Sequence, residues 1–74
     1  MTESKLGGIL KNMYDNAHEG EKVVNIHLFG IKYASIISDN NFRPAEIVRC
    51  SGLSNTYTAE VSKGMKLSNY VIIK

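Results

Sequence analysis

The longest apolar stretch of the chain, from 21 to 39, sets the main limit on what it can fold into. The Val and Ile residues in it would suit buried strands. Its polar residues nevertheless recur mostly on one side at helical spacing, so we predict a helix over 21–39. A helix this apolar lies either at the centre of the fold or in a dimer interface. The polar residues are Lys22, Asn25, Lys32, Ser35 and Asp39, and the apolar ones are Val23, Val24, Ile26, Leu28, Phe29, Ile31, Tyr33, Ala34, Ile36 and Ile37.

With 74 residues, the chain has room for a single domain, 1–74, with a small core. Hydrophobic residues make up 43% of it and charged residues 22%, which is typical of a globular protein and not of a disordered one. Domains of this size often gain stability by pairing with a second copy. We therefore expect a homodimer.

The residues that most often carry chemistry are sparse. Cys50 is the single cysteine, so neither an internal disulfide nor a multi-cysteine metal site can form. His18, His27 and Cys50 lack the spacing of metal ligands or of a nucleophile with its base, and no Gly-rich phosphate loop is present. We expect no enzymatic activity, no metal and no cofactor. Because no membrane-spanning run or signal-peptide pattern is visible, we place the protein in the cytoplasm and away from membranes.

The segment 44–64 has the spacing of a helix-turn-helix. Pro44 is favoured in a first helical turn, where its missing N–H costs nothing. Gly52 supplies the positive φ that a tight turn between two helices requires. Ser54 is a good N-cap for the second helix, and Gly64 is expected to close that helix. The residues expected to face the core are Ile47, Val48, Leu53 and Val61.

The two ends of the chain complete the expected fold. Apolar residues at helical spacing predict an N-terminal helix within 1–19, which ends near Gly20. The segment 65–74 is a C-terminal arm, in which Tyr70–Ile73 is either a short strand or an arm that packs on its own domain or on a partner. The sequence therefore predicts an all-α fold, a small bundle of about four helices that contains a helix-turn-helix, with a short extended C-terminal segment.

The predicted motif resembles the helix-turn-helix of the Xre and Cro family of repressor-like proteins. Members often read Ser-Gly-Leu-Ser, two variable residues, Tyr, then Glu, an aliphatic residue and a closing Gly. Val48 and Thr58 depart from the family pattern, which usually has Ala and then Ile or Val at these positions. The resemblance covers 45–64 and implies a divergent, short member. The matching residues are Ser51-Gly52-Leu53-Ser54, Tyr57, Glu60-Val61 and Gly64.

The resemblance implies a small transcriptional regulator that binds duplex DNA sequence-specifically, with a recognition helix at 54–63 in the major groove. Asn55 and Thr56 are expected to hydrogen-bond to base edges, and Ala59 to contact a thymine methyl group. A homodimer would read two half-sites about one helical turn, roughly 34 Å, apart. The residues expected to contact phosphates are Arg43, Arg49, Ser54, Lys63 and Lys66.

The same residues also permit a non-enzymatic protein-interaction module, such as an antitoxin-like or phage-encoded accessory protein on a helix-turn-helix scaffold. Segment 1–42 carries four Lys and five Asp or Glu, a net charge of −1, whereas 43–74 carries five Lys or Arg and two Glu, a net charge of +3. One continuous positive surface on the second segment would favour DNA as the partner. Neutralisation of that surface by Glu46 and Glu60 would favour a protein partner.

Overall fold

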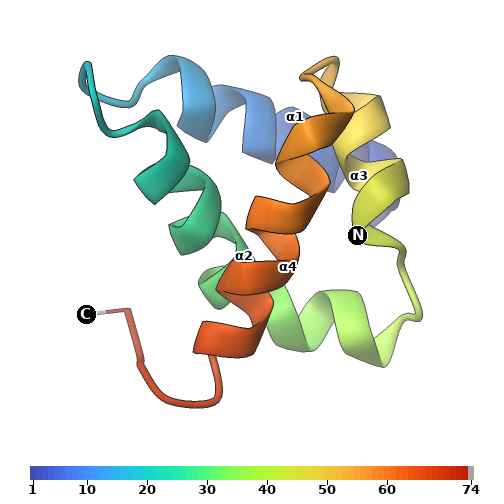
Figure 1. Ribbon diagram of the computed structural model, residues 1–74. Helices are drawn as coiled ribbons and strands as arrows, with labels where there is room; N and C mark the ends of the chain where they lie inside the picture. The colour runs from blue at the N-terminus through green and yellow to red at the C-terminus, as the bar shows by residue number, and fades with distance from the viewer. Residues whose placement is uncertain (74) are drawn as a thin grey trace.

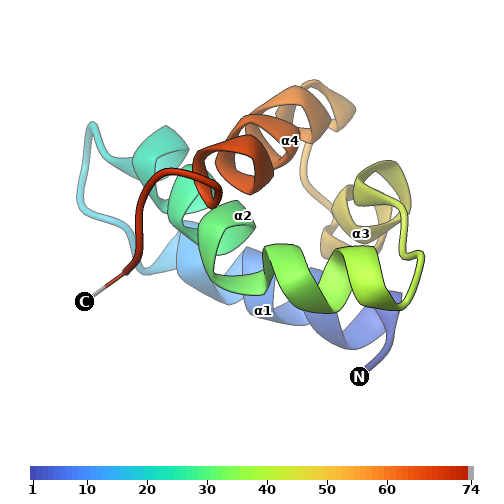
Figure 2. The same cartoon turned by 90° about the horizontal axis from the view of Figure 1, so that it is seen from below.

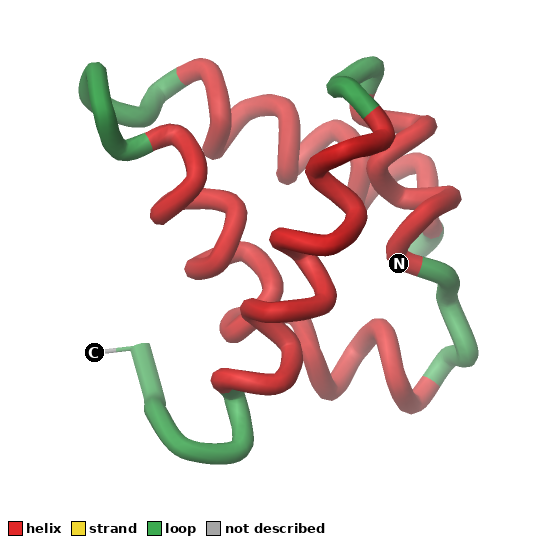
Figure 3. Tube along the Cα trace, viewed as in Figure 1, coloured by secondary structure: helices red, strands yellow, loops and turns green. Residues whose placement is uncertain are grey.

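The computed structural model describes residues 1–73, which form four α-helices and one short 3-10 turn (Figure 1). No strand occurs in this range, and loops join one helix to the next throughout (Figure 3). The predicted all-α bundle of about four helices is confirmed. None of the described helices is both long and apolar enough to cross a bilayer. The elements are α1 (Glu3–Asp15), α2 (Lys22–Asp39), α3 (Pro44–Ser51), the 3-10 turn η1 (Asn55–Tyr57) and α4 (Thr58–Leu67).

Helix α2 is the predicted helix of the apolar stretch, and it supplies the largest share of the core. Ile26, Phe29 and Ile37 of α2 are at most 1% exposed. Val23 and Val24, near its beginning, are 43% and 48% exposed, so the helix is not buried on every side. The other three helices each contribute at least one fully buried aliphatic side chain to the same core. These are Leu6 and Leu10 of α1, Ile47 and Val48 of α3, and Val61 of α4.

Helices α2 and α4 cross in direct backbone contact, with α4 in front of α2 in Figure 1. The contact is made by Gly30 of α2 and Gly64 of α4. A Cβ atom on Gly64 would lie 2.3 Å from the carbonyl oxygen of His27, and one on Gly30 would lie 2.5 Å from that of Val61. Side chains at the crossing would push the helices apart, so both positions need glycine.

The expectation that Gly64 closes the second helix of the motif is therefore wrong. Helix α4 continues through Gly64 to Leu67. Positive φ among the described glycines occurs only at Gly20 and Gly52, so Gly64 has no left-handed, helix-ending conformation. Glycine is required at position 64 because α2 passes close to it, and not because α4 ends there.

Helices α1 and α3 also approach closely at a glycine, Gly7. A Cβ atom on Gly7 would lie 2.7 Å from the Cβ of Cys50 and 2.9 Å from the backbone nitrogen of Ser51. The next residue, Gly8, is exposed, and a Cβ atom there would meet nothing within 4 Å. Two adjacent glycines of one helix thus have opposite environments.

We expect Gly7→Ala and Gly8→Ala to change stability in opposite directions. Gly7→Ala should lower the free energy of unfolding by about 1 to 3 kcal/mol, because the added methyl overpacks the α1–α3 contact. Gly8→Ala should raise it by about 0.5 to 1 kcal/mol, because alanine is the better helix former at an open position. Urea unfolding followed by circular dichroism measures both. Equal effects of the two substitutions would contradict the assigned packing.

The end of α1 differs from its prediction. Helix α1 ends at Asp15, before the expected end near Gly20. The backbone N–H and the side-chain amide of Asn16 both donate to the carbonyl oxygen of Asn12, at 3.0 and 2.8 Å, and these bonds cap the helix early. Gly20 has a φ of +83° and lies in the turn that leads into α2.

The C-terminal segment is extended but is not a strand within the described residues. Helix α4 takes up the first part of the predicted arm, so the non-helical part begins at Ser68. Residues 71–73 return beside α2 and form a groove with its Ile31 and Lys32 (Figures 1 and 2). Of the alternatives for this segment, the structure shows an arm beside its own domain, with Ile72 left 90% exposed. Lys74 of the predicted arm lies outside the described residues.

Candidate nucleic-acid interface

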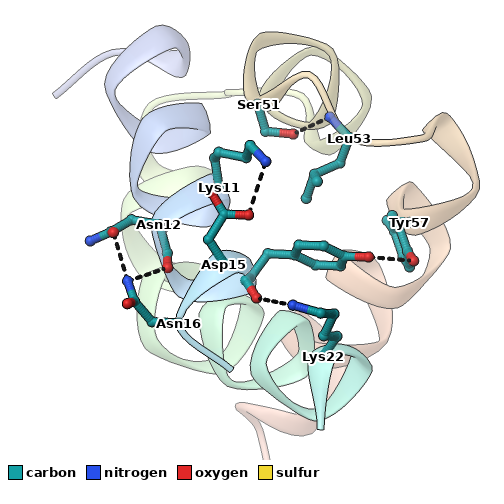
Figure 4. A network of polar contacts seen from close by, with 9 residues as sticks. Lys11, Asn12, Asp15, Asn16, Lys22, Ser51, Leu53 and Tyr57 are labelled. Atoms are coloured by element: carbon teal, nitrogen blue, oxygen red, sulfur yellow. Dashed lines mark hydrogen bonds and ion pairs between the residues drawn. The ribbon is translucent and has the colours of Figure 1, made fainter. Parts of the chain in front are cut away.

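The turn between α3 and α4 is built as the sequence predicts. Gly52 has a φ of +77° and ends α3, and its N–H donates to the carbonyl oxygen of Arg49 at 3.1 Å. The hydroxyl of Ser51, which is buried, accepts from the N–H of Leu53 at 3.1 Å (Figure 4). Leu53 packs against the core. These contacts fix the direction in which the chain enters the second helix of the motif.

The second helix begins with a 3-10 turn. The Ser54 hydroxyl accepts from the backbone N–H of Thr56 at 3.4 Å and lies 3.0 Å from the Thr56 hydroxyl. Ser54 is thus an N-cap, as predicted, although it caps η1 and not an α-helix. The α-helical part starts only at Thr58. Because 3-10 turns are common at helix N-termini, the predicted helix 54–63 corresponds to η1 followed by the first part of α4.

The residues predicted to contact bases share the exposed side of this element. Asn55, Thr56 and Ala59 are all exposed. Lys63 and Lys66 are also exposed, and they follow Ala59 at spacings of four and three, which places the three residues on one face of α4. The opposite face carries the buried Val61 and Gly64. Five of the eight predicted contact residues therefore lie on one surface, called here the α4 face: Asn55, Thr56, Ala59, Lys63 and Lys66.

The predicted phosphate contacts on α3 are arranged differently. Arg49 of α3 donates from Nε to both carboxylate oxygens of Glu46 at 3.0 Å, and its Nη2 also contacts Oε1. The hydrogen bond from Arg49 lowers the pKa of Glu46, and the same bond raises the pKa of Arg49. Arg43 is exposed just before α3, and its backbone N–H donates to Glu3 of α1 at 2.8 Å. Arg49 is therefore an already paired cation.

A second glutamate, Glu60, lies at the border of the α4 face. Its Oε2 accepts from Lys63 at 3.4 Å, and its Oε1 accepts from Nε2 of His27 on α2 at 2.7 Å. The hydrogen bond from His27, followed by that from Lys63, holds the pKa of Glu60 below its ordinary value. Sequence analysis missed the His27–Glu60 pair, because the residues are 33 positions apart and only the crossing of α2 and α4 joins them.

We expect the pH dependence of stability to report this pair. Because the pKa of Glu60 is lowered on folding, its carboxylate stabilises the fold above the ordinary glutamate value of 4.5, and this stabilisation is lost as pH falls through the lower folded pKa. Glu60→Gln should therefore flatten the acid side of the stability profile, measured by urea unfolding from neutral to acidic pH. Glu19→Gln, at an exposed residue outside the ion pairs of the described range, should leave the profile unchanged. A profile that is equally steep for Glu60→Gln and the wild type would contradict the pairing.

Sequence analysis also missed a polar contact beside the α4 face. The hydroxyl groups of Tyr14, at the end of α1, and Tyr57, in η1, lie 3.1 Å apart and share a hydrogen bond. Their rings are tilted against each other with centroids 5.4 Å apart. The hydrogen bond with Tyr14 raises the pKa of Tyr57. The half-buried ring of Tyr57 packs on the core, and its hydroxyl also bonds to a second helix.

Comparison with known proteins adds one finding to this geometry. No match is found among curated proteins or among solved structures. The family model of the HTH-like domain matches residues 2–74, from the first helix to the last residue of the chain. This match agrees with the α3–turn–α4 geometry, and it extends beyond the segment that resembles Xre and Cro repressors. The chain therefore belongs to the family of helix-turn-helix-like domains.

Proposed function

We propose that this domain binds duplex DNA sequence-specifically as a small transcriptional regulator, with the α4 face in the major groove. The observation that carries the proposal is the exposure of Asn55, Thr56 and Ala59 together at the start of the second motif helix. This is the part of a helix-turn-helix that reaches base edges. An amide, a hydroxyl and a methyl group supply the contacts needed to distinguish base pairs. Membership of the helix-turn-helix-like family supports the same partner.

The charges predict modest, strongly salt-dependent binding. Lys66 and Arg43 have no ion pair within the described part of the chain, whereas Lys63 and Arg49 are each paired with a glutamate. Neutralisation of phosphates by cations releases counterions, so each phosphate contact makes the affinity fall more steeply with salt. With two free and two paired cations the affinity should be modest, and it should fall steeply as salt rises.

The test is selection from a random duplex library, followed by fluorescence anisotropy at low and physiological salt. Enrichment of a short site is the expected result. We propose that the protein binds as a homodimer, in which case the site should be a palindrome with half-sites about 34 Å apart. Molecular mass in the same buffers tests the dimer independently. Absence of binding to any duplex at low salt would overturn the proposal.

We expect Asn55→Ala combined with Thr56→Ala to reduce sequence preference. The ratio of affinities for the selected and a mismatched site should fall about tenfold, because lost base-edge hydrogen bonds no longer penalise the wrong base. Since the Thr56 hydroxyl also contacts Ser54, Asn55→Ala alone is the variant that leaves the cap intact. The matched control is Ser4→Ala, an exposed residue in the first turn of α1, away from the contact of Tyr14 with Tyr57. An unchanged affinity ratio would contradict the assigned recognition residues.

A second function has specific support. The pairing of Arg49 with Glu46 and of Lys63 with Glu60 neutralises half of the four cations expected at phosphates, which favours a protein partner. Exposed apolar side chains at Tyr70 and Ile72 would suit the same role. An interaction module should show no duplex binding at low salt, and its oligomeric state should change when these two residues are replaced by serine.

The motif also supports a closer relation to Xre and Cro repressors. Gly52, Ser54 and Tyr57 occupy positions of that pattern, with Gly52 in the left-handed turn and Ser54 as an N-cap. Gly64 occupies the last position of the pattern but lies inside α4. We therefore propose the relation for the turn and the start of the recognition helix alone.

A further inference from the structure

Where α1 leads into α2, the side chain of Tyr14 forms a corner with Tyr57, which lies at the start of the recognition element. We propose that Lys22, Tyr14 and Tyr57 at this corner form a binding site for a backbone phosphodiester of duplex DNA. This site, called here the tyrosine corner, extends the proposed interface, and it rests on the proposed function. Sequence reasoning assigned phosphate contacts only to 43–66 and gave none to α1 or α2.

The tyrosine corner has more hydrogen-bond donors than its hydrogen bonds within the protein use. Each phenol carries one hydrogen, and the bond between the Tyr14 and Tyr57 hydroxyls uses one of the two. The ammonium group of Lys22 has three hydrogens, and one of them is donated to the backbone carbonyl of Tyr14 at 3.0 Å (Figure 4). One hydroxyl hydrogen and two ammonium hydrogens therefore remain available to an acceptor outside the protein.

The side chains of the corner are also held in place. The ammonium group of Lys22 lies 4.6 Å from the centroid of the Tyr14 ring, and that ring packs against the ring of Tyr57. Tyr14 and Tyr57 both pack on the hydrophobic core. A lysine fixed between a carbonyl oxygen and an aromatic ring loses less freedom on binding than a lysine that extends into solvent. The corner is thus pre-organised for an anion.

The charge of the corner is not neutralised by a carboxylate, unlike the charges of three other cationic residues. Arg49 and Lys63 are paired with glutamates, and Lys11 is paired with Asp15 at 2.9 Å. Lys22 forms no ion pair with a carboxylate in the part of the chain that the structure describes. An incoming phosphate therefore need not displace a carboxylate from Lys22, as it would from Arg49.

The position of the corner fits a second DNA strand. In Figure 1, α3 lies on one side of α4, and the end of α1 with the start of α2 lies on the other. Phosphates line both edges of the major groove, which is about 12 Å wide, so a helix inserted there has a strand on each side. Arg43 precedes α3 on one side, and the tyrosine corner stands on the other. Tyr57 directly follows Asn55 and Thr56, so a phosphate bound here would fix the register of the recognition residues.

The experiment compares Lys22→Met, Tyr14→Phe and Tyr57→Phe with the wild type, using anisotropy on a duplex over a range of salt concentrations. The matched controls are Lys32→Met and Tyr33→Phe, because Lys32 also lies over a tyrosine ring, at 5.5 Å, but in the middle of α2 and away from the corner. Methionine keeps the apolar stem of lysine, and phenylalanine keeps the ring. Circular dichroism melting of each variant tests whether it is folded.

Lys22→Met should reduce the salt slope, the change of log affinity with log salt, by about 1 and weaken binding to all sequences alike. The phenylalanine variant that removes the free hydroxyl hydrogen should weaken binding about tenfold at unchanged slope, because a neutral donor to a charged group is lost. The other phenylalanine variant should have the smaller effect, since its hydroxyl only bonds to the first. Lys32→Met and Tyr33→Phe should match the wild type. A folded Lys22→Met protein with the wild-type slope would overturn the tyrosine corner alone, whereas a wild type that binds no duplex would overturn the proposed function with it.

Discussion

Gly64→Ala is expected to lower the free energy of unfolding by about 3 kcal/mol, at the upper end of what overpacking costs. The added Cβ would lie 2.3 Å from the carbonyl oxygen of His27 and 3.0 Å from the Cα of Gly30. Both contacts are with backbone, so no side chain can rotate away, and α2 and α4 must separate. For a domain of this size the loss is a large fraction of total stability. Urea unfolding gives the value directly.

The partner glycine provides the internal check. Gly30→Ala should cost a similar amount, because its Cβ would lie 2.5 Å from the carbonyl oxygen of Val61. The double variant should cost less than the sum of the two single ones, since the first substitution already separates the helices. Gly8→Ala, at the open position of α1, serves as the control for inserting alanine into a helix. A loss below about 1 kcal/mol for Gly64→Ala would contradict the close crossing.

The features that local rules determine were predictable from the sequence. The spacing of polar residues identified α2, and Pro44, Gly52 and Ser54 identified the two ends of α3 and the cap of η1. Each of these signals acts within a few residues of chain. The end of α1 was missed although its cause is local, because Asn16 ends the helix with its own amide before Gly20 is reached.

The features that depend on contact between distant helices were not predictable. Gly64 stands where a helix could end, but α4 continues past it, and glycine is needed there because the backbone of α2 at His27 and Gly30 passes so close. His27 and Glu60 have no relation in the sequence, yet they bond at 2.7 Å one turn from the same crossing. A single sequence contains no signal for which helix faces which, so these pairs emerge only from the fold.

The candidate site also combines features that were predictable from local sequence with features that depend on contacts between helices. Asn55, Thr56 and Ala59 are exposed, as the predicted base contacts require. Which cations are free to contact phosphates was not predicted, because this depends on which carboxylate lies beside each cation. Arg49 and Glu46 are three residues apart on one helix, so their pairing was within reach of sequence reasoning. Lys22 lies beside Tyr14 because α1 packs against α2, and Tyr14 in turn contacts Tyr57 of η1. Neither contact has a signal in the sequence.

Charge reversal on the α4 face is expected to have the largest effect on binding. Lys63→Glu combined with Lys66→Glu should reduce the salt slope by about 2 and weaken duplex binding more than tenfold for every sequence, because two phosphate contacts become repulsions. Anisotropy on selected and random duplexes at several salt concentrations measures both quantities. The loss should be equal on the two duplexes, since phosphates carry no sequence information.

The two lysines are expected to differ when each is neutralised alone. Lys66→Gln should weaken binding more than Lys63→Gln, because Lys63 shares its charge with Glu60 at 3.4 Å, while Lys66 has no ion pair within the described residues. Lys5→Glu with Lys32→Glu, at exposed positions of α1 and α2 outside the proposed DNA contacts, is the matched control for a change in net charge. If that control weakened binding as much as the α4 variant, long-range charge alone would explain the loss. An effect confined to α4 would identify this helix as the surface that meets the DNA backbone.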